Sequence, residues 1–571
     1  MKTLGAQLAL VLGEREFRKN LRALLKFVLL VLAVIVAFTI LFHVIMINVE
    51  GQEHSWFTGF YWTLTVMSTL GFGDITFQTD LGRMFSVVVL VTGILLLLVV
   101  LPFTFIRFFY APWLEAQVKV RAPRSLPAEV EGHVILCGWD TIAPGLIARL
   151  KDEGVAYVIL EESPERAARM KEEGLSVVTG ELDSVATYRN VNVKRARLVI
   201  ANLDDVTNTN MALTIREAAP DVAVASISTN EDSQDILTLA GSTHVLPLRR
   251  LLGEQLANRV NAGHAQTHVV GSFRDLLIAE FPVLNTPLSG KTIRDTRLRE
   301  MVGVNIVGVW EQARLMPAHP DRVLTDLCLP MVVGTREQME ELDELLYIYD
   351  TNHHPVLVMG GGKVGRAACR ALKKRDIRVH LIEKNERLAK RLEGVADELF
   401  IGDAAHLELL IEAGIDRAPA VLLTTNDDAM NVFLAVYCRK LRPDVRIVSR
   451  ITHERNMASI RRAGADLALS YSGLGVQTLN SIIMGQELVV LGEGVELHRT
   501  PVPSWLEGRT LAESHIGAHT GLSVVAVQDG EDLVTNPRAT TRLERGVELF
   551  MIGNQDQMKA FRELNGRDFP T

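Results

Sequence analysis

A glycine-rich segment in the second half of the chain has the composition of a phosphate-binding loop. Gly360, Gly362 and Gly365 have the spacing of a dinucleotide-binding fingerprint, and they follow a short apolar run at residues 356–359. The first glycine permits a tight turn, the second lets the backbone approach a phosphate, and the third lets a helix pack closely on a strand. The unpaired N–H groups at the start of that helix can then hold the anion.

The polar residues around this loop indicate which nucleotide it would take. Lys363 and Val364 complete the loop, and Lys363 adds a cation beside the phosphates. Glu383 stands at the end of the next apolar run after the loop, where its carboxylate can accept hydrogen bonds from ribose hydroxyls. Because a carboxylate disfavours a 2′-phosphate, we predict NAD or an adenine nucleotide (ADP or ATP) rather than NADP. In the alternative interpretation, the glycines serve only helix packing.

The same order of elements occurs earlier in the chain, at a constant offset in the numbering. At that offset Glu161 corresponds to Glu383 and Gly180 to Gly402. In each copy, short apolar runs alternate with helical patterns, which indicates a doubly wound parallel sheet. We therefore predict two Rossmann-like lobes that arose by internal duplication.

The loop of the first copy differs where the phosphate would lie. Asp140 stands at the position of Gly362, and a carboxylate facing a pyrophosphate is repulsive, so we expect no dinucleotide in this lobe. Acidic side chains there could instead hold a cation such as Ca²⁺. The candidate ligands are Asp140, Glu161, Glu181 and Asp183. Scattered surface acids are more often simply solvated, so the calcium site stays an open alternative.

Two long uncharged apolar runs near the N-terminus have the length of membrane-spanning helices. They cover residues 27–49 and 84–106. A helix of either length spans about 35 Å, enough to cross a bilayer with some tilt. Basic residues precede the first run, whereas residues 51–82 contain no Lys or Arg. The positive-inside rule therefore predicts a multi-pass protein of the inner (plasma) membrane with both termini and the duplicated lobes in the cytoplasm.

Gly93 and Pro102 lie within the second apolar run and are candidate hinges. Pro102 cannot donate a hydrogen bond to the carbonyl of Leu98, and its ring crowds that carbonyl, so the helix is expected to kink or break there. An ordinary membrane helix also carries glycine and proline more often than a soluble one, which is the alternative explanation.

The hexapeptide of residues 69–74 lies between the two apolar runs and is the second segment whose residue types indicate a function. It follows an apolar, aromatic stretch at residues 56–69, for which Ser55 is a plausible helix cap. It resembles the selectivity filter of potassium channels, in which backbone carbonyls from four subunits replace the hydration shell of K⁺. The resemblance implies that these carbonyls line a K⁺ pore, with the glycines supplying positive φ. The filter residues are then Thr69, Leu70, Gly71, Phe72 and Gly73. Phe72 replaces the usual tyrosine, so the support of this filter must differ in detail.

A smaller α/β unit follows each Rossmann-like copy and is repeated as well, with Gly290 corresponding to Gly508. This order of elements resembles a two-transmembrane-helix potassium channel of the prokaryotic ligand-gated type, bearing tandem RCK domains (regulators of K⁺ conductance, TrkA-N/TrkA-C-like). The resemblance covers nearly the whole chain. It implies a homotetramer with a cytoplasmic ring of eight RCK domains that controls the pore. It also implies that Asp403, which follows Gly402 after the third strand, belongs to the nucleotide site.

The predicted fold class is a membrane all-α pore domain, with two transmembrane helices and a re-entrant pore helix, followed by tandem α/β Rossmann-like RCK domains, each with a smaller α/β lobe. The predicted divisions are a cytoplasmic segment (1–26), the pore domain (27–110), a linker (111–132), the first RCK N-lobe (133–265) and C-lobe (266–350), and the second N-lobe (351–485) and C-lobe (486–571). The net charge of -8 at pH 7 implies no large basic face and argues against a nucleic-acid partner. The four cysteines are far apart in the sequence and are expected to be buried thiols.

These patterns together predict a ligand-gated potassium channel rather than an enzyme. Two alternatives are a membrane-anchored NAD-dependent oxidoreductase and an RCK-regulated K⁺ transporter subunit. An oxidoreductase needs a general acid or base. His353 and His354 precede the glycine loop, and nothing else resembles a catalytic pair. A transporter of that kind would need many more membrane-spanning segments than two.

Overall fold

The computed structural model describes most of the chain. The described residues are 15–107, 123–260, 267–273, 275–284, 286–311, 314–346, 354–485, 495–530, 532–535 and 537–564. The first half of the predicted N-terminal segment and most of the predicted linker lie outside them. The chain forms two compact units, one holding the apolar N-terminal helices and one holding most of the duplicated copies.

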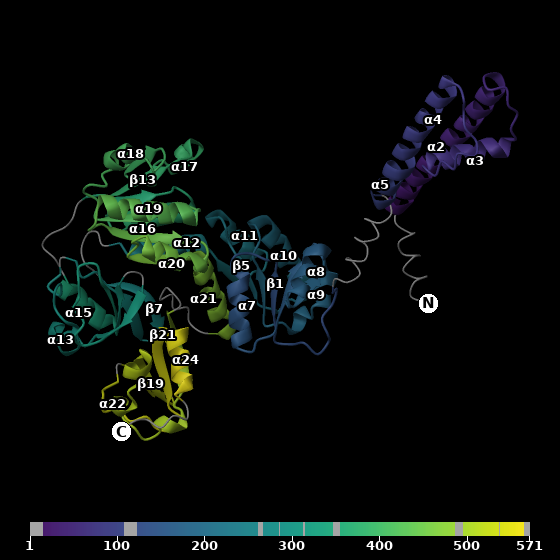
Figure 1. The fold of residues 1–571 in the computed structure, drawn as a ribbon. Helices are drawn as coiled ribbons and strands as arrows, with labels where there is room; N and C mark the ends of the chain where they lie inside the picture. Colours follow the sequence, from purple (N-terminus) through teal and green to yellow (C-terminus); the bar gives the residue numbers. More distant parts are fainter. Residues whose placement is uncertain are drawn as a thin grey trace. The chain divides into compact units, whose positions relative to one another are not determined.

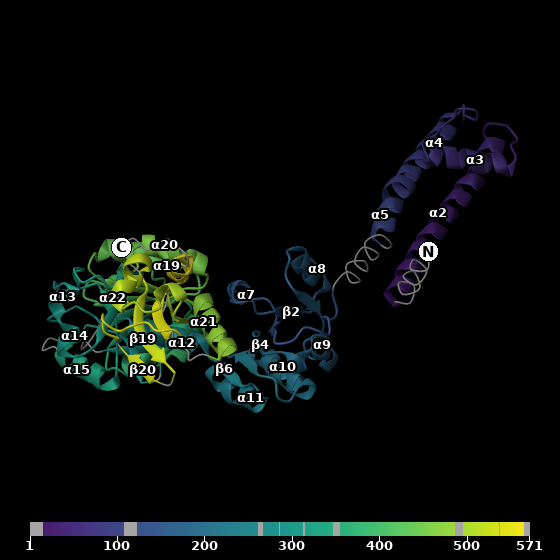
Figure 2. The ribbon, with the colours of Figure 1, turned by 90° about the horizontal axis from the view of Figure 1, so that it is seen from below.

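The apolar N-terminal helices pack together (Figure 1; Figure 2), and buried apolar side chains, among them Trp62, form their core. Its elements are α2 (Arg15–Asn48), α3 (Trp56–Met67), α4 (Asp80–Gly93), the π-helix η1 (Ile94–Val100) and α5 (Leu101–Phe105). The segments Leu25–Asn48 and Asp80–Thr104 are long and apolar enough to cross a membrane. Trp62 of α3 lies at the centre of the core, with its ring centroid 4.9 Å from Phe42, 5.2 Å from Phe77 and 5.7 Å from Phe85.

The first copy begins with a six-stranded parallel sheet in the order β3-β2-β1-β4-β5-β6. Its strands are β1 (Val134–Cys137), β2 (Tyr157–Glu161), β3 (Val177–Thr179), β4 (Leu198–Ala201), β5 (Val224–Ile227) and β6 (His244–Leu246). Its helices are α7 (Ala143–Asp152), α8 (Pro164–Glu172), α9 (Val185–Asn190), α10 (Asp205–Ala218), α11 (Gln234–Leu239) and α12 (Leu248–Asn258). The central strands β1 and β4 are buried along their whole length, which explains why they are uniformly apolar.

The second copy repeats this topology, with the strand order β14-β13-β12-β15-β16-β17. Its strands are β12 (Val356–Met359), β13 (Val379–Glu383), β14 (Glu398–Ile401), β15 (Ala420–Leu423), β16 (Arg446–Ile451) and β17 (Leu467–Ser470). Its α-helices are α16 (Lys363–Lys373), α17 (Ala389–Leu392), α18 (Leu407–Glu412), α19 (Asp428–Leu441), α20 (Met457–Arg462) and α21 (Tyr471–Met484). In the chain, two apolar helices are followed by two parallel sheets, which confirms the predicted fold class. The four cysteines are buried and free, as expected.

A smaller antiparallel sheet follows each parallel one. The first has the order β10-β9-β11-β8-β7 and comprises β7 (His268–Phe273), β8 (Leu276–Glu280), β9 (Asn305–Glu311), β10 (Arg314–Pro317) and β11 (Leu329–Gly334), with α13 (Ile293–Thr296), α14 (Leu298–Met301) and α15 (Arg336–Leu346). The second has the order β18-β21-β19-β20 and comprises β18 (Val495–Pro501), β19 (Ser523–Asp529), β20 (Asp532–Thr535) and β21 (Glu548–Asn554), with α22 (Leu511–Ser514), α23 (Ile516–Thr520) and α24 (Gln555–Glu563).

Each copy packs one of its helices against the other copy. The helix α12, which ends the first parallel sheet, packs against α16 of the second copy, and α21 of the second copy packs against α7 of the first (Figure 1). Glycines make both contacts close. A Cβ on Gly253 of α12 would collide with the carbonyl of Val364, and one on Gly145 of α7 would lie 3.0 Å from the side chain of Val476. The glycine loop of each copy therefore leads into a helix that contacts the other copy.

Candidate functional site

Along the predicted filter, residues with positive φ alternate with residues that do not have positive φ. Thr69, Gly71 and Gly73 have φ of 65°, 48° and 74°, whereas Leu70 and Phe72 between them do not have positive φ. Such alternation turns successive carbonyls toward the same side, which an ordinary strand cannot do. The side chains of Leu70 and Phe72 are 62% and 65% exposed in the single chain. The filter segment thus presents a surface that its own chain does not cover.

The pore helix α3 supports this segment through side chains that sequence reasoning missed. Trp62 Nε1 donates a hydrogen bond to the carbonyl of Ile75 at 3.2 Å, and the carboxylate of Asp74 lies beside the hydroxyl of Tyr61. The backbone N–H of Leu70 also donates to the carbonyl of Thr65 at 2.9 Å. These contacts join the filter segment to α3 and to the residue that follows it. Their only sequence signal was the aromatic content of residues 56–69.

A carboxylate joins the end of the first span to the start of the second. Glu50 follows α2, and its Oε1 accepts hydrogen bonds from the N–H of Thr79 at 2.9 Å and from its hydroxyl at 2.7 Å. The N–H of Gln78 donates to the same carboxylate at 3.1 Å. The bond from the Thr79 N–H is the main reason that the pKa of Glu50 lies below its ordinary value. Glu50 therefore holds together the two ends of the segment that carries the filter.

The two hinge candidates occupy different environments. Gly93 ends α4 and lies directly against the backbone of Met67 at the end of α3, where any Cβ would collide. The π-helix η1 follows, and the N–H of Leu101 donates to the carbonyl of Leu96, five residues earlier. Pro102 then lies in the first turn of α5. The helix therefore does not break at Pro102: the wider π-helical turns before the proline accommodate its missing donor.

The glycine loop of the second copy has the predicted shape. Gly360 has a φ of 109°, and a Cβ on Gly365 would collide with the carbonyl of Gly360, so both positions require glycine. Gly362 differs, because a Cβ there would meet nothing within 4 Å. Val364 is buried. Thr424, which sequence reasoning missed, donates from Oγ1 to the carbonyl of Gly360 at 2.8 Å and fixes the turn from the neighbouring strand.

Two carboxylates lie at the edge of the sheet beside this loop. Glu383 Oε2 accepts a hydrogen bond from the N–H of Gly361 at 2.6 Å, which brings the carboxylate into direct contact with the loop. Asp403 Oδ2 accepts one from Lys384 Nζ at 2.6 Å, and this bond is the first reason that the pKa of Asp403 is lowered. Both predicted acids lie at the ends of neighbouring strands. Lys384 directly follows Glu383, so its bond to Asp403 links the two strand ends.

Lys363 faces residues of the first copy. It lines a cavity of about 190 Å³ together with residues 228–232, Pro247, Arg249 and Arg250 of the first copy. Burial is the largest cause that lowers its pKa, followed by the charge of Arg249. The structure therefore places Lys363 between the copies, a position that local sequence could not indicate.

The loop of the first copy is occupied by its own aspartate. Asp140 Oδ1 accepts hydrogen bonds from the N–H groups of Ile142 and Ala143 at 3.1 and 3.0 Å, at the start of α7. Those donors are the ones that a phosphate would need. Burial raises the pKa of the Asp140 carboxyl. Asp140 thus disfavours nucleotide binding in two ways: it occupies the N–H groups that a phosphate would need, and its carboxylate repels the phosphate.

The calcium ligand set stays a prediction. Among the residues that the structure describes, no three or more His, Cys, Asp or Glu side chains form a group that could hold a metal ion. The four candidates were Asp140, Glu161, Glu181 and Asp183. Two of them have local partners: Asp140 accepts from the N–H groups of Ile142 and Ala143, and Glu161 accepts from the N–H of Ser163 at 3.1 Å and pairs with Arg166 at 3.4 Å.

Comparisons with known proteins agree with this architecture. The chain matches the family models described as Ion channel over residues 28–110, TrkA-N domain over residues 134–247 and 356–471, and TrkA-C domain over residues 495–566. A solved structure described as the GsuK channel bound to NAD is 34% identical, with a TM-score of 0.57; the match covers 95% of this chain and 99% of that chain.

Two curated relatives are more distant. Potassium channel protein 1 of Methanocaldococcus jannaschii is 22% identical over 316 residues, which are 54% of this chain and 94% of the relative. The calcium-gated potassium channel TvoK of Thermoplasma volcanium is 23% identical over 317 residues, 52% of this chain and 87% of the relative. With its ion-channel segment, its two TrkA-N segments and its match to GsuK along nearly the whole length, the chain belongs to the family of two-transmembrane-helix potassium channels with RCK domains.

Proposed function

We propose that this protein is a potassium channel opened or closed by a nucleotide that binds the second RCK lobe. The observation that carries the proposal is the pairing, in one chain, of two features. One is a filter-like backbone with positive φ at residues 69, 71 and 73, and the other is a glycine loop in contact with an acid, Glu383. The first feature suits a dehydrated cation and the second suits a ribose phosphate.

The filter requires several copies of the chain. One chain contributes one row of carbonyls, whereas K⁺ must be surrounded on all sides to replace its hydration shell. Four copies around an axis would complete the coordination and cover the exposed side chains of Leu70 and Phe72. Four chains with two RCK copies each would also supply the eight domains of a gating ring. We place the filter in the plasma membrane and the RCK copies in the cytoplasm.

The ligand that we propose is NAD or an adenine nucleotide. The loop of residues 360–365, with Glu383 and Asp403, offers the backbone donors and carboxylates that such a ligand needs. The solved GsuK structure, described as bound to NAD, supports this choice. Because the acids considered for calcium are not gathered, we propose the nucleotide alone as the ligand and expect no turnover of it.

Nucleotide binding can supply enough free energy to gate the pore. A ligand shifts an equilibrium only by its difference in affinity between the two states. Four sites that each prefer one state about tenfold supply about 5.5 kcal/mol, enough to move a mostly closed pore to mostly open. The Rossmann lobe of the second copy contacts the first copy through α12 and α16, which gives the bound ligand a route to the other lobes.

The test is K⁺ flux through the purified protein in liposomes, with and without NAD, ADP or ATP. We expect flux that depends on the nucleotide and exceeds Na⁺ flux. An absence of K⁺ flux under every ligand would contradict the channel. Flux that ignores all three nucleotides would contradict only the gating. Oxidation of NADH by the same preparation would instead favour the oxidoreductase.

A further inference from the structure

The cavity that Lys363 lines lies between the two copies. The loops that follow β5 and β6 of the first copy form one wall, and α16 of the second copy forms the other. Its basic lining residues are Arg249, Arg250, Lys363, Arg366 and Arg370. Two carboxylates, Glu231 and Asp232, accompany these five cations, so the lining carries an excess of three positive charges. Of the residues predicted for the nucleotide site, Lys363 alone lines it.

Only part of this charge is neutralised by neighbouring side chains. Arg370 pairs with Glu231 at 2.6 Å, and Arg250 lies 3.7 Å from Glu254. In contrast, Arg249, Lys363 and Arg366 form no ion pair with any carboxylate in the part of the chain that the structure describes. Burial lowers the pKa of Lys363 first, followed by the charge of Arg249; the charge of Asp205 opposes this shift, and the charge of Arg366 adds to it. An anion between these cations would relieve their repulsion.

Helix packing does not by itself require these cations. The duplication places a second junction of the same kind in the molecule, where α21 packs on α7. At the offset that relates Glu161 to Glu383, the three cations of α16 correspond to uncharged residues of the first copy. Lys363, Arg366 and Arg370 become Thr141, Pro144 and Ala148. The equivalent face of α7 therefore packs without any of the three charges, and their presence on α16 alone points to a ligand rather than to assembly of the fold.

The opposite wall is held in place before any ligand arrives. The carboxylate of Asp205 accepts hydrogen bonds from the N–H groups of Thr229 and Asn230 at 2.6 and 2.9 Å, and from Asn230 Nδ2 at 2.8 Å. These contacts fix the loop that carries Glu231. A wall that is already ordered loses little conformational entropy when it binds a ligand.

The size of the cavity limits what it can hold. Pockets for whole nucleotides and drug-sized ligands usually measure about 300–1,000 Å³. A cavity of about 190 Å³ is too small for a dinucleotide but large enough for one or two phosphate groups. Arginine binds phosphate through paired N–H donors, and two arginines without a carboxylate partner in the described chain, Arg249 and Arg366, face this space.

We propose that this cavity is a second ligand site, which binds a small phosphate oxyanion such as phosphate or pyrophosphate between the two RCK copies. The oxyanion would bridge Arg249 of α12 and Arg366 of α16 and would stabilise the contact between these helices. It would thus make the junction between the copies sensitive to phosphate, separately from the glycine loop.

The test is calorimetric titration of the purified full-length channel with pyrophosphate, then with phosphate, in a phosphate-free buffer. We expect saturable binding, weakened at least about tenfold by Arg366→Gln and likewise by Arg249→Gln, since each variant removes a charged hydrogen-bond donor. The matched control is Lys374→Gln, an exposed cation at the end of α16 that does not line the cavity. Retained NAD binding shows that a variant is folded, and either arginine variant suffices if the other does not fold.

A further variant separates this site from the nucleotide site. Gly362→Asp is designed to block the glycine loop and should leave pyrophosphate binding unchanged. Loss of pyrophosphate binding in Gly362→Asp would show that the anion occupies the glycine loop, and would overturn the proposal. Equal affinity in wild type and both arginine variants would also overturn it. If ATP competes with pyrophosphate in the Gly362→Asp protein, the phosphate comes from a nucleotide; if it does not, the ligand is the free anion.

Discussion

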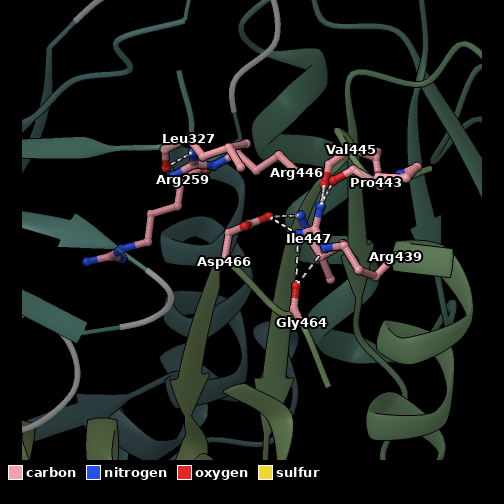
Figure 3. Close-up of polar contacts among 9 residues, drawn as sticks. All are labelled: Arg259, Leu327, Arg439, Pro443, Val445, Arg446, Ile447, Gly464 and Asp466. Atoms are coloured by element: carbon pink, nitrogen blue, oxygen red, sulfur yellow. Dashed lines mark hydrogen bonds and ion pairs between the residues drawn. The ribbon is translucent and has the colours of Figure 1, made fainter. Parts of the chain in front are cut away.

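Arg446 Nη1 donates a hydrogen bond to the carbonyl of Leu327 at 2.9 Å, which joins the second Rossmann lobe to the small lobe of the first copy (Figure 3). The same guanidinium donates from Nε to the carbonyl of Arg259, at the end of α12, at 3.1 Å. Only 2% of the Arg446 surface is exposed. Burial lowers its pKa, and the charges of Asp466 and Glu280 oppose that shift. One buried cation thus connects α12, β16 and the first small lobe.

Arg446→Met should therefore destabilise the RCK copies. The substitution leaves the carbonyls of Leu327 and Arg259 without their donor, and an unsatisfied buried group such as the Arg259 carbonyl costs about 1–3 kcal/mol. We expect the midpoint of thermal unfolding to fall by several degrees, measured by differential scanning fluorimetry. Arg391→Met, on the exposed surface of α17, is the control and should unfold like the wild type. An unchanged midpoint for Arg446→Met would show that the buried bonds contribute no net stability.

Gly73→Ala should abolish K⁺ flux. Gly73 has a φ of 74°, which a Cβ disfavours, and a change of this angle would turn a carbonyl away from the ion path. Gly51→Ala is the matched control, because Gly51 has a φ of 67° but lies in the loop before the pore helix. Both variants should bind NAD normally, so that loss of flux reports on the filter alone. Normal flux in Gly73→Ala would contradict the assignment of the filter.

Trp62→Phe should lower the selectivity for K⁺ over Na⁺. The variant keeps an aromatic ring in the core but removes the donor to the carbonyl of Ile75, so the outer end of the filter loses a support. The permeability ratio in planar bilayers measures the effect. Trp56→Phe is the control, since Trp56 is 64% exposed and stacks on His43 instead. If the two variants had the same selectivity, the indole bond would not hold the filter.

Gly362→Asp should remove the response to nucleotide and leave conduction intact. A Cβ at this position meets nothing within 4 Å, so the fold should tolerate the change. The new carboxylate would imitate Asp140, which accepts bonds from the first N–H groups of α7. Calorimetric titration with NAD and flux assays on the same preparation test both parts. Unchanged NAD affinity would place the nucleotide elsewhere.

The contact between the copies should also weaken in acid. His268 of the first small lobe accepts a hydrogen bond from Arg375 of the second copy at 3.1 Å. Burial, and then the charge of Arg375, lowers the pKa of His268 from 6.5 to about 3. The unfolded chain therefore takes up a proton that the folded one refuses, so stability is full above pH 6.5 and falls as the pH drops from 6.5 toward 3.

A scan of the thermal midpoint between pH 7.5 and about pH 5 measures this effect. We expect His268→Gln, which keeps an acceptor but does not titrate, to flatten part of the slope. His519→Gln is the control, because His519 lies on the exposed part of α23 in the second small lobe. A wild-type slope in His268→Gln would mean that other groups cause the acid sensitivity.

The features that could be predicted from sequence are those that depend on residues close to one another in the chain. A long uncharged apolar run must cross a bilayer or be buried, whatever follows it, and alternating apolar runs form a parallel sheet. The spacing of Gly360 and Gly365 fixes a turn whose φ of 109° and close helix packing the structure confirms. The internal repeat likewise predicted that the second sheet would copy the first.

Tertiary structure decided everything that joins distant residues. Trp62 reaches Ile75 past the filter, and Lys363 faces the first copy because α12 and α16 are packed together. Spacing along a chain determines backbone conformation and periodicity, whereas the neighbours of a side chain depend on which faces pack together, and that is settled only when the whole chain folds.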